Sequence, residues 1–328
     1  MKLAVLGAGA WGTAISISLA SRHAVALWAR DAALAGEITA TRTNPRYLPG
    51  FQIPDAVAVT AELSAALAGC ELVLAVPTVA GLRLMLRQLA AAGNAAPVVW
   101  LCKGFEVETL RLPHQIAAAE LPAALPCGVL SGPSFAAEIA RGLPAALTLA
   151  SCDASFAARM VRALHSPQLR VYSSEDVIGV EVAGALKNVI AIASGICDGL
   201  GLGHNARAAL ITRGLAEITR LGLKLGGRLE TFMGLAGAGD LVLTCTGELS
   251  RNRSVGLRLA RGVALAEALR SLGHVAEGVY SARAVDRLAR ELAIDMPITR
   301  AVCRVMDEHL SAREAVHELL QRDPKAEY

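Results

Sequence analysis

The sequence predicts an α/β fold: an N-terminal Rossmann-like, doubly wound sheet followed by an all-helical C-terminal domain. The apolar run from Lys2 to Leu6 has the pattern of a short strand, and the motif Gly7-Ala-Gly-Ala-Trp-Gly12 follows it directly. Residues Thr13 to Ala20 then have helical character. The second half shows helical periodicity broken by glycine-rich turns and no convincing strand pattern. We therefore expect a dinucleotide-binding domain over residues 1–174 and a helical substrate-binding and catalytic domain over residues 175–328.

The composition is that of a folded protein with a large core. The chain has 328 residues, 54% of them hydrophobic and 19% charged, which suits about two domains. The net charge is only +3, and lysines and arginines are scattered among acidic residues, so we predict no nucleic-acid partner and no polybasic membrane patch. The apolar stretches are interrupted by glycine, proline or a charge before they reach the roughly 20 residues of a spanning helix, so we expect no membrane insertion.

The cysteines and the N-terminus indicate a cytoplasmic protein. The seven cysteines are odd in number and widely spaced, which is typical of reduced core residues. The apolar start of the chain superficially resembles a secretory signal peptide, but a glycine motif in its middle would make a poor helix. Neither a Cys-x-x-Cys pair nor a His-Glu-x-x-His motif occurs, so we predict no metal site.

The glycine motif predicts a dinucleotide site. Gly7 permits the tight turn after the strand, Gly9 lets the backbone approach a pyrophosphate, and Gly12 allows close packing of the helix. The N-terminus of that helix adds a positive dipole that favours an anion. The motif alone is weak evidence, and the strand before it and the helix after it strengthen the interpretation.

The second predicted strand, Ala24 to Trp28, bears on the choice of cofactor. It ends where NAD-preferring sites place an acid on the ribose 2′-hydroxyl, and here Arg30 and Asp31 follow. An arginine suits a 2′-phosphate, so we expect NADP(H) to be preferred, whereas Asp31 leaves NAD(H) possible. In the alternative interpretation Arg30 is a surface residue paired with Asp31.

Further strand patterns alternate with helical segments such as Val79 to Ala92, as a doubly wound sheet requires. Ligands bind outside the carboxyl ends of the strands in such sheets. Lys103, Gly132 and Ser134 each follow a strand and are therefore expected to line one crevice, although a lysine in that place is often simply solvated. The expected strands are Leu72 to Val76, Val98 to Cys102, Gly128 to Leu130, Ala146 to Ala150 and Leu169 to Ser173.

Lys187 is the only charged residue between Glu181 and Asp198. Its neighbours at helical spacing are small or apolar, so nothing local pairs with it and a ligand has room to approach. Burial of a lysine lowers its pKa towards the range that is useful for proton transfer. The alternative is a lysine that extends from an apolar helix face to water.

Two motifs in the second half combine small residues with polar ones. Gly234-Leu-Ala-Gly-Ala-Gly-Asp240 is a turn of small residues that delivers a carboxylate. In Ser250-Arg-Asn252, Ser250 can cap a helix whose N–H groups, with Arg251 beside them, hold a phosphate. Each motif also has a structural interpretation, in which Asp240 only caps a helix and Arg251 lies at the surface.

Taken in order, these motifs resemble those of bacterial-type NAD(P)-dependent glycerol-3-phosphate dehydrogenases, and the resemblance covers nearly the whole chain. Its tail, from about Ser311, carries no motif. The matching segments are Gly7 to Thr13, Asn44-Pro-Arg-Tyr-Leu-Pro-Gly50, Lys103-Gly104, Ser131-Gly-Pro-Ser-Phe-Ala136, Gly184-Ala-Leu-Lys-Asn188, Gly234 to Asp240, Ser250 to Asn252 and Val275-Ala-Glu-Gly278.

The resemblance implies interconversion of dihydroxyacetone phosphate and sn-glycerol 3-phosphate by a cytoplasmic homodimer that feeds phospholipid synthesis. Lys187 matches the family's proton donor and acceptor. Ala10 stands where a serine is frequent, and Ser134 where a threonine is frequent; neither change removes the group that the site needs. Substrate-contacting positions match Lys103, Gly132, Ser134, Lys187, Asp240, Ser250, Arg251 and Asn252. Cofactor-contacting positions match Gly7, Gly9, Ala10, Trp11, Gly12, Arg30, Tyr47, Lys103, Ala136, Arg251, Val275 and Glu277.

The chemistry of the residues agrees with that activity. As an acid, Lys187 protonates the ketone oxygen while a nicotinamide delivers hydride to the carbon. We expect Lys103 to share the developing charge on the oxygen or to tune Lys187 by like-charge repulsion. Asp240 is expected to orient an ammonium or a substrate hydroxyl. Two alternatives stay open: a related dehydrogenase of β-hydroxy acids, in which a carboxylate replaces the phosphate, and a catalytically inactive NADP(H)-binding sensor.

Overall fold

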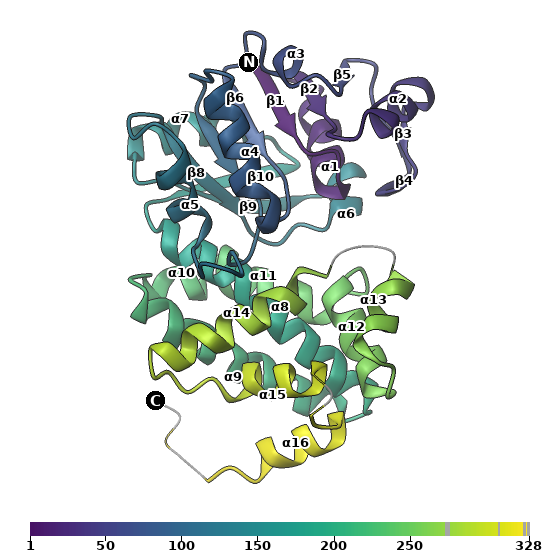
Figure 1. The fold of residues 1–328 in the computed structure, drawn as a ribbon, viewed down its shortest axis with the longest axis vertical. Helices are drawn as coiled ribbons and strands as arrows, with labels where there is room; N and C mark the ends of the chain where they lie inside the picture. Colours follow the sequence, from purple (N-terminus) through teal and green to yellow (C-terminus); the bar gives the residue numbers. More distant parts are fainter. Residues whose placement is uncertain (273–275, 308, 324–325, 327–328) are drawn as a thin grey trace. The chain divides into compact units, whose positions relative to one another are not determined.

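The computed structural model describes residues 1–272, 276–307, 309–323 and 326, which form two compact units (Figure 1). Unit 1 comprises Met1–Lys103 and Arg111–Glu181, and unit 2 comprises Gly104–Leu110 and Val182–Tyr328. Unit 1 contains the large sheet, and unit 2 is helical. The predicted fold class is therefore confirmed.

The sheet of unit 1 has eight strands in the order β10-β9-β8-β7-β6-β1-β2-β5. Neighbouring strands are parallel except β8 and β9, so the sheet is mixed at one side. The strand order reverses between β1 and β6, and sheets of this type bind ligands at that point, outside the carboxyl ends of the strands. The strands are β1 (Lys2–Leu6), β2 (Ala24–Trp28), β5 (Val57–Thr60), β6 (Leu72–Ala75), β7 (Val98–Trp100), β8 (Cys127–Ser131), β9 (Ala145–Ala150) and β10 (Leu169–Ser174).

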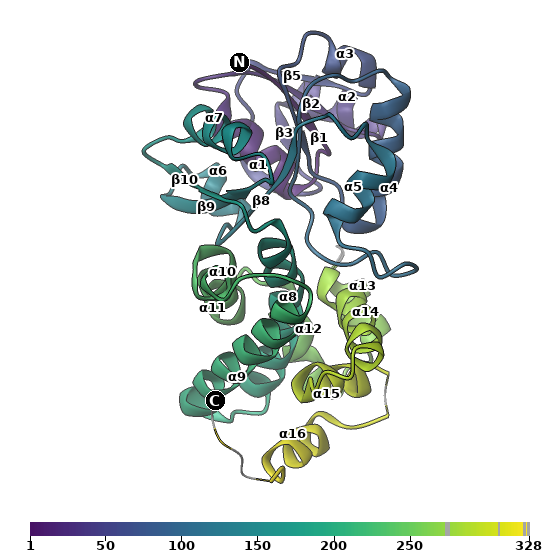
Figure 2. The same ribbon diagram turned by 90° about the vertical axis from the view of Figure 1, so that its left-hand side faces the viewer.

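Helices cover both faces of this sheet, with α4 and α5 on one side and α1 and α6 on the other (Figure 2). A short antiparallel hairpin, β3 (Thr43–Asn44) with β4 (Leu48–Gln52), lies outside the large sheet and was not predicted. The helices of unit 1 are α1 (Ala10–Leu19), α2 (Ala32–Thr41), α3 (Leu63–Leu67), α4 (Val79–Ala91), α5 (Pro113–Glu120), α6 (Ala136–Ala140) and α7 (Ala154–Leu164).

Unit 2 contains no strand among its described residues, as the periodicity predicted. Its central element is α8 (Val177–Gly199), which begins in unit 1 and continues into unit 2. The others are α9 (Gly203–Lys224), α10 (Leu229–Met233), a single π-helical turn η1 (Leu235–Gly239), α11 (Asp240–Thr246), α12 (Arg251–Ala260), α13 (Leu265–Leu272), α14 (Glu277–Glu291), α15 (Pro297–Met306) and α16 (Ala312–Leu320).

Helix α8 corrects one expectation about the apolar stretches. Its 23 residues are long and apolar enough to cross a membrane, although the sequence interpretation held that no stretch reaches that length. In the structure, however, 94% of its most apolar window is buried inside the protein. A core helix satisfies the same length and hydropathy criteria as a spanning one, because both are apolar on all sides.

The division between the units falls after Glu181, whereas the sequence placed a domain boundary after residue 174, at the end of β10. Contacts of the Glu181 side chain explain the difference. Its carboxylate accepts hydrogen bonds from Trp100 Nε1 at 2.7 Å, from the His114 backbone N–H at 2.9 Å and from His114 Nδ1 at 2.6 Å. These bonds hold the beginning of α8, as far as Glu181, in unit 1. Burial raises the pKa of the Glu181 carboxyl group.

Candidate functional site

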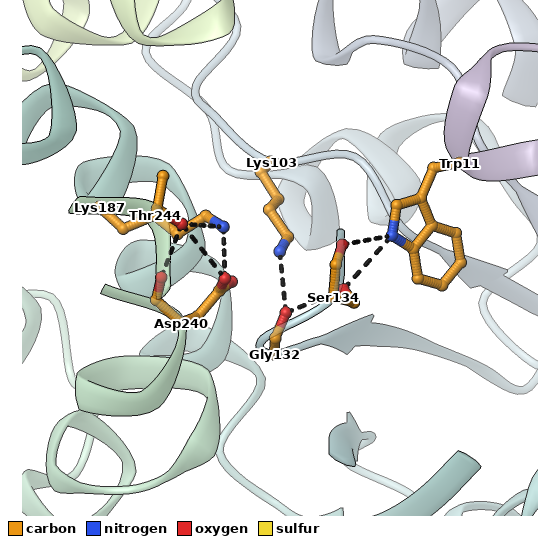
Figure 3. Close-up of polar contacts among 7 residues, drawn as sticks. All are labelled: Trp11, Lys103, Gly132, Ser134, Lys187, Asp240 and Thr244. Atoms are coloured by element: carbon orange, nitrogen blue, oxygen red, sulfur yellow. Dashed lines mark hydrogen bonds and ion pairs between the residues drawn. The ribbon is translucent and has the colours of Figure 1, made fainter. Parts of the chain in front are cut away.

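The structure gathers the predicted site residues into separate clusters within each unit, and Figure 3 draws two of them. In unit 2, Lys187 and Asp240 meet together with Thr244. In unit 1, Lys103 and Ser134 both reach the Gly132 carbonyl, and Trp11 reaches Ser134.

Lys187 is a buried, paired ammonium on α8. Only 8% of the residue is exposed, so its side chain does not extend to water as the alternative interpretation supposed. Its Nζ donates hydrogen bonds to Asp240 Oδ1 and, at 2.9 Å, to Thr244 Oγ1. Lys187 and Asp240 are 53 residues apart in the sequence, which is why local spacing gave the lysine no partner.

Asp240 is the first residue of α11 and directly follows the π-helical turn η1. The turn lies tightly against α10, because a Cβ added to Gly237 would be only 2.1 Å from the Phe232 carbonyl oxygen. The carboxylate is fully buried and lies at the N-terminus of α11. Single π-helical turns are frequent at functional sites, and this one aims a carboxylate at the lysine.

Thr244 is a member of the cluster that the sequence analysis missed. Its hydroxyl donates to the Asp240 backbone carbonyl at 2.6 Å, so the oxygen faces Lys187 as an acceptor. The spacing of Asp240 and Thr244, one helical turn apart, is the signal that could have identified it. Next to it, burial raises the pKa of Cys245 to about 12, so this thiol stays neutral beside the ion pair.

The N-terminus of α12 is built as the sequence predicted. Ser250 is its N-cap, and Ser250 Oγ accepts a hydrogen bond from the Arg253 backbone N–H at 3.3 Å. Arg251, the first residue of the helix, is exposed, and the first turn contains no acidic residue. Asn252 is buried and its Oδ1 accepts from the Gly278 N–H at 3.1 Å, which ties α12 to the start of α14. This turn presents N–H groups and a guanidinium, and both suit an anion.

One of the predicted cofactor contacts lies at the start of α14. Glu277 is the first residue of that helix, next to the Gly278 N–H that Asn252 holds. Val275 lies outside the described residues.

The glycine loop of unit 1 has the shape that its motif predicts. Gly7 has φ +121°, and a Cβ there would be 2.6 Å from the Val76 carbonyl oxygen. A Cβ on Gly12 would be 1.9 Å from the Gly7 carbonyl oxygen, whereas one on Gly9 would meet nothing within 4 Å. Helix α1 begins at Ala10 without a side-chain cap and without an acid in its first turn. These residues fit a dinucleotide, because a pyrophosphate needs open space at the second glycine and N–H groups at the helix start.

Asn44 holds this loop in place, a role that the sequence analysis did not assign to it. The side chain is fully buried, and its Nδ2 donates to the Ala8 carbonyl at 2.9 Å and to Thr13 Oγ1 at 2.8 Å. Its Oδ1 accepts from the Tyr47 N–H at 3.2 Å, so the hairpin that carries Tyr47 is fixed to the glycine loop. The carboxamide therefore holds two backbone groups, the Ala8 carbonyl and the Tyr47 N–H, and the Thr13 hydroxyl.

The second cluster of Figure 3 confirms that Lys103, Gly132 and Ser134 lie together. Lys103 Nζ donates to the Gly132 carbonyl at 3.4 Å, and Ser134 Oγ donates to the same oxygen at 3.0 Å. Trp11 Nε1 donates to the Ser134 carbonyl at 3.1 Å, which connects the glycine loop to this segment. Ala136, which begins α6, packs against the hydrophobic core of unit 1.

The contacts of Asp31 bear on the alternative interpretation of Arg30, in which the two residues are paired. Asp31 caps α2 through Oδ1, which accepts from the Ala33 N–H at 3.0 Å, and its Oδ2 pairs with Arg46 at 3.4 Å. Arg46 also lies over the Tyr47 ring, 5.1 Å from its centroid. Asp31 is therefore engaged by the helix and by Arg46, while Arg30 extends into solvent.

Two family models together match most of the chain. The model of the NAD-dependent glycerol-3-phosphate dehydrogenase N-terminus matches residues 2–157, and that of its C-terminus matches residues 176–317. Relatives named glycerol-3-phosphate dehydrogenase [NAD(P)+] include one from Nitrosospira multiformis, 58% identical over 100% of this chain and 99% of its own length. One from Thiobacillus denitrificans is 58% identical over 100% of both chains.

Solved structures agree with the family models. The crystal structure of glycerol-3-phosphate dehydrogenase from Coxiella burnetii has a TM-score of 0.94 and 43% identity, covering 98% of this chain and 99% of that one. A D-mandelate dehydrogenase matches with a TM-score of 0.62 at 14% identity, over 94% of this chain and 98% of that one, and this likeness shows the fold alone.

The buried ion pair makes a prediction about stability. Asp240→Ala should lower the free energy of unfolding by about 3 kcal/mol, because it leaves the Lys187 ammonium buried without its counter-charge. The double variant Lys187→Met with Asp240→Ala should recover much of that loss, because it buries no unpaired charge. Urea unfolding followed by circular dichroism measures these two variants and Lys187→Met alone, and strictly additive losses would contradict a direct interaction.

Proposed function

The chain belongs to the family of NAD-dependent glycerol-3-phosphate dehydrogenases, and on that premise we propose how its own residues carry out the reaction. It is an oxidoreductase that interconverts dihydroxyacetone phosphate and sn-glycerol 3-phosphate with NAD(P)(H), and this activity supplies glycerol 3-phosphate for phospholipid synthesis. The observation that supports the assignment of roles best is the buried cluster of Lys187, Asp240 and Thr244.

The cofactor is held by unit 1. The N–H groups at the start of α1 bind its pyrophosphate, and Gly9 gives the phosphates room. Trp11 and Tyr47 flank this loop, and the other side chains of this unit that we assign to the cofactor are those of Arg30, Lys103 and Ala136. When bound, the reduced nicotinamide supplies a hydride to the carbonyl carbon of the substrate. In unit 2, Arg251, Val275 and Glu277 are the residues that we assign to the cofactor.

The substrate phosphate binds at the N-terminus of α12. Backbone N–H groups of the first turn, the Ser250 hydroxyl and the Arg251 guanidinium donate to its oxygens. Asn252 stabilises this turn through Gly278 and offers its Nδ2 to the substrate. Binding of this non-reacting group provides energy that positions the carbonyl.

Lys187 is the acid of the reduction. Its ammonium donates a proton to the ketone oxygen as the carbon gains hydride, which yields the secondary alcohol; in the reverse direction the amine accepts the hydroxyl proton. Asp240 and Thr244 fix the position of Nζ, since both accept its hydrogen bonds. The Asp240 carboxylate also supplies the counter-charge of the buried ammonium.

Lys103, Gly132 and Ser134 contribute further substrate contacts. Lys103 carries a positive charge that stabilises the negative charge developing on the substrate oxygen. Its ammonium and the Ser134 hydroxyl are both held at the Gly132 carbonyl, which keeps the two donors close to each other.

The domain roles, oligomeric state and compartment belong to the same proposal. Residues 1–174 bind the cofactor and residues 175–328 bind the substrate, and the limits of the family models, 2–157 and 176–317, support this boundary.

The protein acts in the cytoplasm as a homodimer without membrane insertion. Exposed apolar side chains on α10 and α11, Leu229, Met233 and Val242, are of the kind that a subunit interface covers. A monomer in sedimentation velocity would refute the dimer.

Replacing the acid while keeping its charge tests the central role. Lys187→Arg retains a cation for Asp240, but a guanidinium does not release its proton at neutral pH. We expect kcat with NADPH and dihydroxyacetone phosphate to fall by about 10³-fold, within the range of general-acid catalysis, while NADPH affinity measured by fluorescence stays unchanged. The exposed Lys224→Arg on α9 is the matched control. Near-normal turnover of Lys187→Arg would remove this residue from the chemical step.

The cofactor preference makes a second prediction. Arg30→Ala should lower kcat/KM for NADPH about tenfold, because it removes a charge-assisted hydrogen bond to the 2′-phosphate, and should leave kcat/KM for NADH unchanged. Arg162→Ala, which removes an exposed arginine from α7, is the control. An equal fall with both cofactors, or none with either, would exclude Arg30 as the residue that recognises the 2′-phosphate.

A further inference from the structure

A second ion pair in unit 2, which is partly buried, joins the helix of Lys187 to the helix of the phosphate site. Asp198, near the end of α8, contacts Arg253 of α12 through one carboxylate oxygen. Its Oδ2 lies 2.9 Å from Arg253 Nε and 2.7 Å from Arg253 Nη2. The two side chains are only 14% and 16% exposed. Arg207 of α9 reaches the same carboxylate at a longer 3.3 Å. The proposed reaction uses none of these three residues directly.

The backbones of α8 and α12 are in direct contact beside this pair. A Cβ on Gly195 of α8 would be 2.0 Å from the Arg253 carbonyl oxygen, and one on Gly256 of α12 would be 2.0 Å from the Ile192 carbonyl oxygen. No side chain separates the helices there, so the position of α12 along α8 is set by local contacts. The pair formed by Asp198 and Arg253 is a directional contact of this kind, and it lies in the first turn of α12.

The two arginines of the motif Arg251-Asn-Arg253 face different directions. Residues two apart on a helix do not share a face, and here Arg251 is exposed whereas Arg253 points towards α8. Two nitrogens of the Arg253 guanidinium are engaged by Asp198, so Arg253 is poorly suited to hold a substrate phosphate itself. Arg251 is therefore the ligand-binding arginine of the motif, and Arg253 is a fixed point for the backbone that carries it.

We propose that Asp198 and Arg253 are positioning residues for the reaction: their ion pair fixes the first turn of α12 against α8 and so sets the place of the phosphate site relative to Lys187. This inference rests on the proposed function. Its physical basis is that a small misplacement of a bound group lowers the rate of reaction strongly even when no contact to the reacting atoms is lost. The pair acts through Ser250, Arg251 and Asn252, and it touches neither substrate nor cofactor.

The test compares a substrate that has a phosphate with one that lacks it. Arg253→Met and the more conservative Arg253→Lys are assayed with dihydroxyacetone phosphate and with unphosphorylated dihydroxyacetone, using NADPH as the reductant. We expect kcat/KM for dihydroxyacetone phosphate to fall at least tenfold in Arg253→Met and less in Arg253→Lys, which keeps a charge but not the two-nitrogen contact. The values for dihydroxyacetone should stay unchanged, because that molecule does not use the phosphate site.

Arg207→Met is the matched control, since it removes an arginine from the same carboxylate without touching α12. It should keep the full preference for the phosphorylated substrate. The positioning role would be overturned if kcat/KM for both substrates fell by the same factor in Arg253→Met and Arg253→Lys. It would also be overturned if both variants kept the full preference for the phosphorylated substrate. Calorimetry with inorganic phosphate tests the inference without turnover, and we expect Arg253→Met to weaken phosphate binding and Arg207→Met to leave it unchanged. If the wild-type protein did not reduce dihydroxyacetone phosphate, the proposed function would fail, but phosphate binding would still decide the inference.

Discussion

The site depends on one buried ion pair, between Lys187 and Asp240. Removing two opposite charges from water costs several kcal/mol for each ion, and only a close contact with further hydrogen bonds offsets that cost. Asp240 supplies the counter-charge and Thr244 the additional acceptor. Two helices of unit 2 bring these groups into contact, because α8 carries the lysine and α11 carries both of its partners.

Glycines make this arrangement sterically possible by removing Cβ atoms where backbones meet. Gly237 lets the turn before Asp240 lie against α10, and Gly195 and Gly256 let α12 lie against α8. In unit 1 Gly12 allows the same close approach between α1 and the first turn of the glycine loop. A Cβ at any of these glycines would lie less than about 3 Å from a backbone atom of the neighbouring element. A substitution would therefore displace the elements that carry the functional groups.

Much of the fold was predictable because its signals are local. Strand β1, the glycine loop and α1 are contiguous, and the absence of strand patterns after β10 correctly indicated helices. The antiparallel pairing of β8 and β9, the strand β5 and the small hairpin were not predicted, because short strands carry little pattern of their own. The length of this apolar stretch was misjudged because small residues and three charged ones, Glu181, Lys187 and Asp198, make α8 look interrupted, although its mean hydropathy is that of a spanning helix.

Within the site, residue types were easier to predict than their contacts. The isolated lysine, the carboxylate after a glycine turn and the arginine next to a helix N-cap each indicated a functional residue without any knowledge of its contacts. Thr244, Asn44 and Arg253 were missed, because their importance lies in contacts with Lys187, Ala8 and Asp198 that join distant parts of the sequence. Such contacts follow from tertiary packing, which no local pattern encodes.

The most direct measurement is the loss of reduced-nicotinamide absorbance when the purified protein and NADPH are mixed with dihydroxyacetone phosphate. A parallel reaction uses a keto acid that carries a carboxylate where dihydroxyacetone phosphate carries its phosphate. The proposed activity requires rapid oxidation with dihydroxyacetone phosphate and none with the keto acid. Oxidation with the keto acid alone, or with neither compound by protein that binds NADPH, would contradict it.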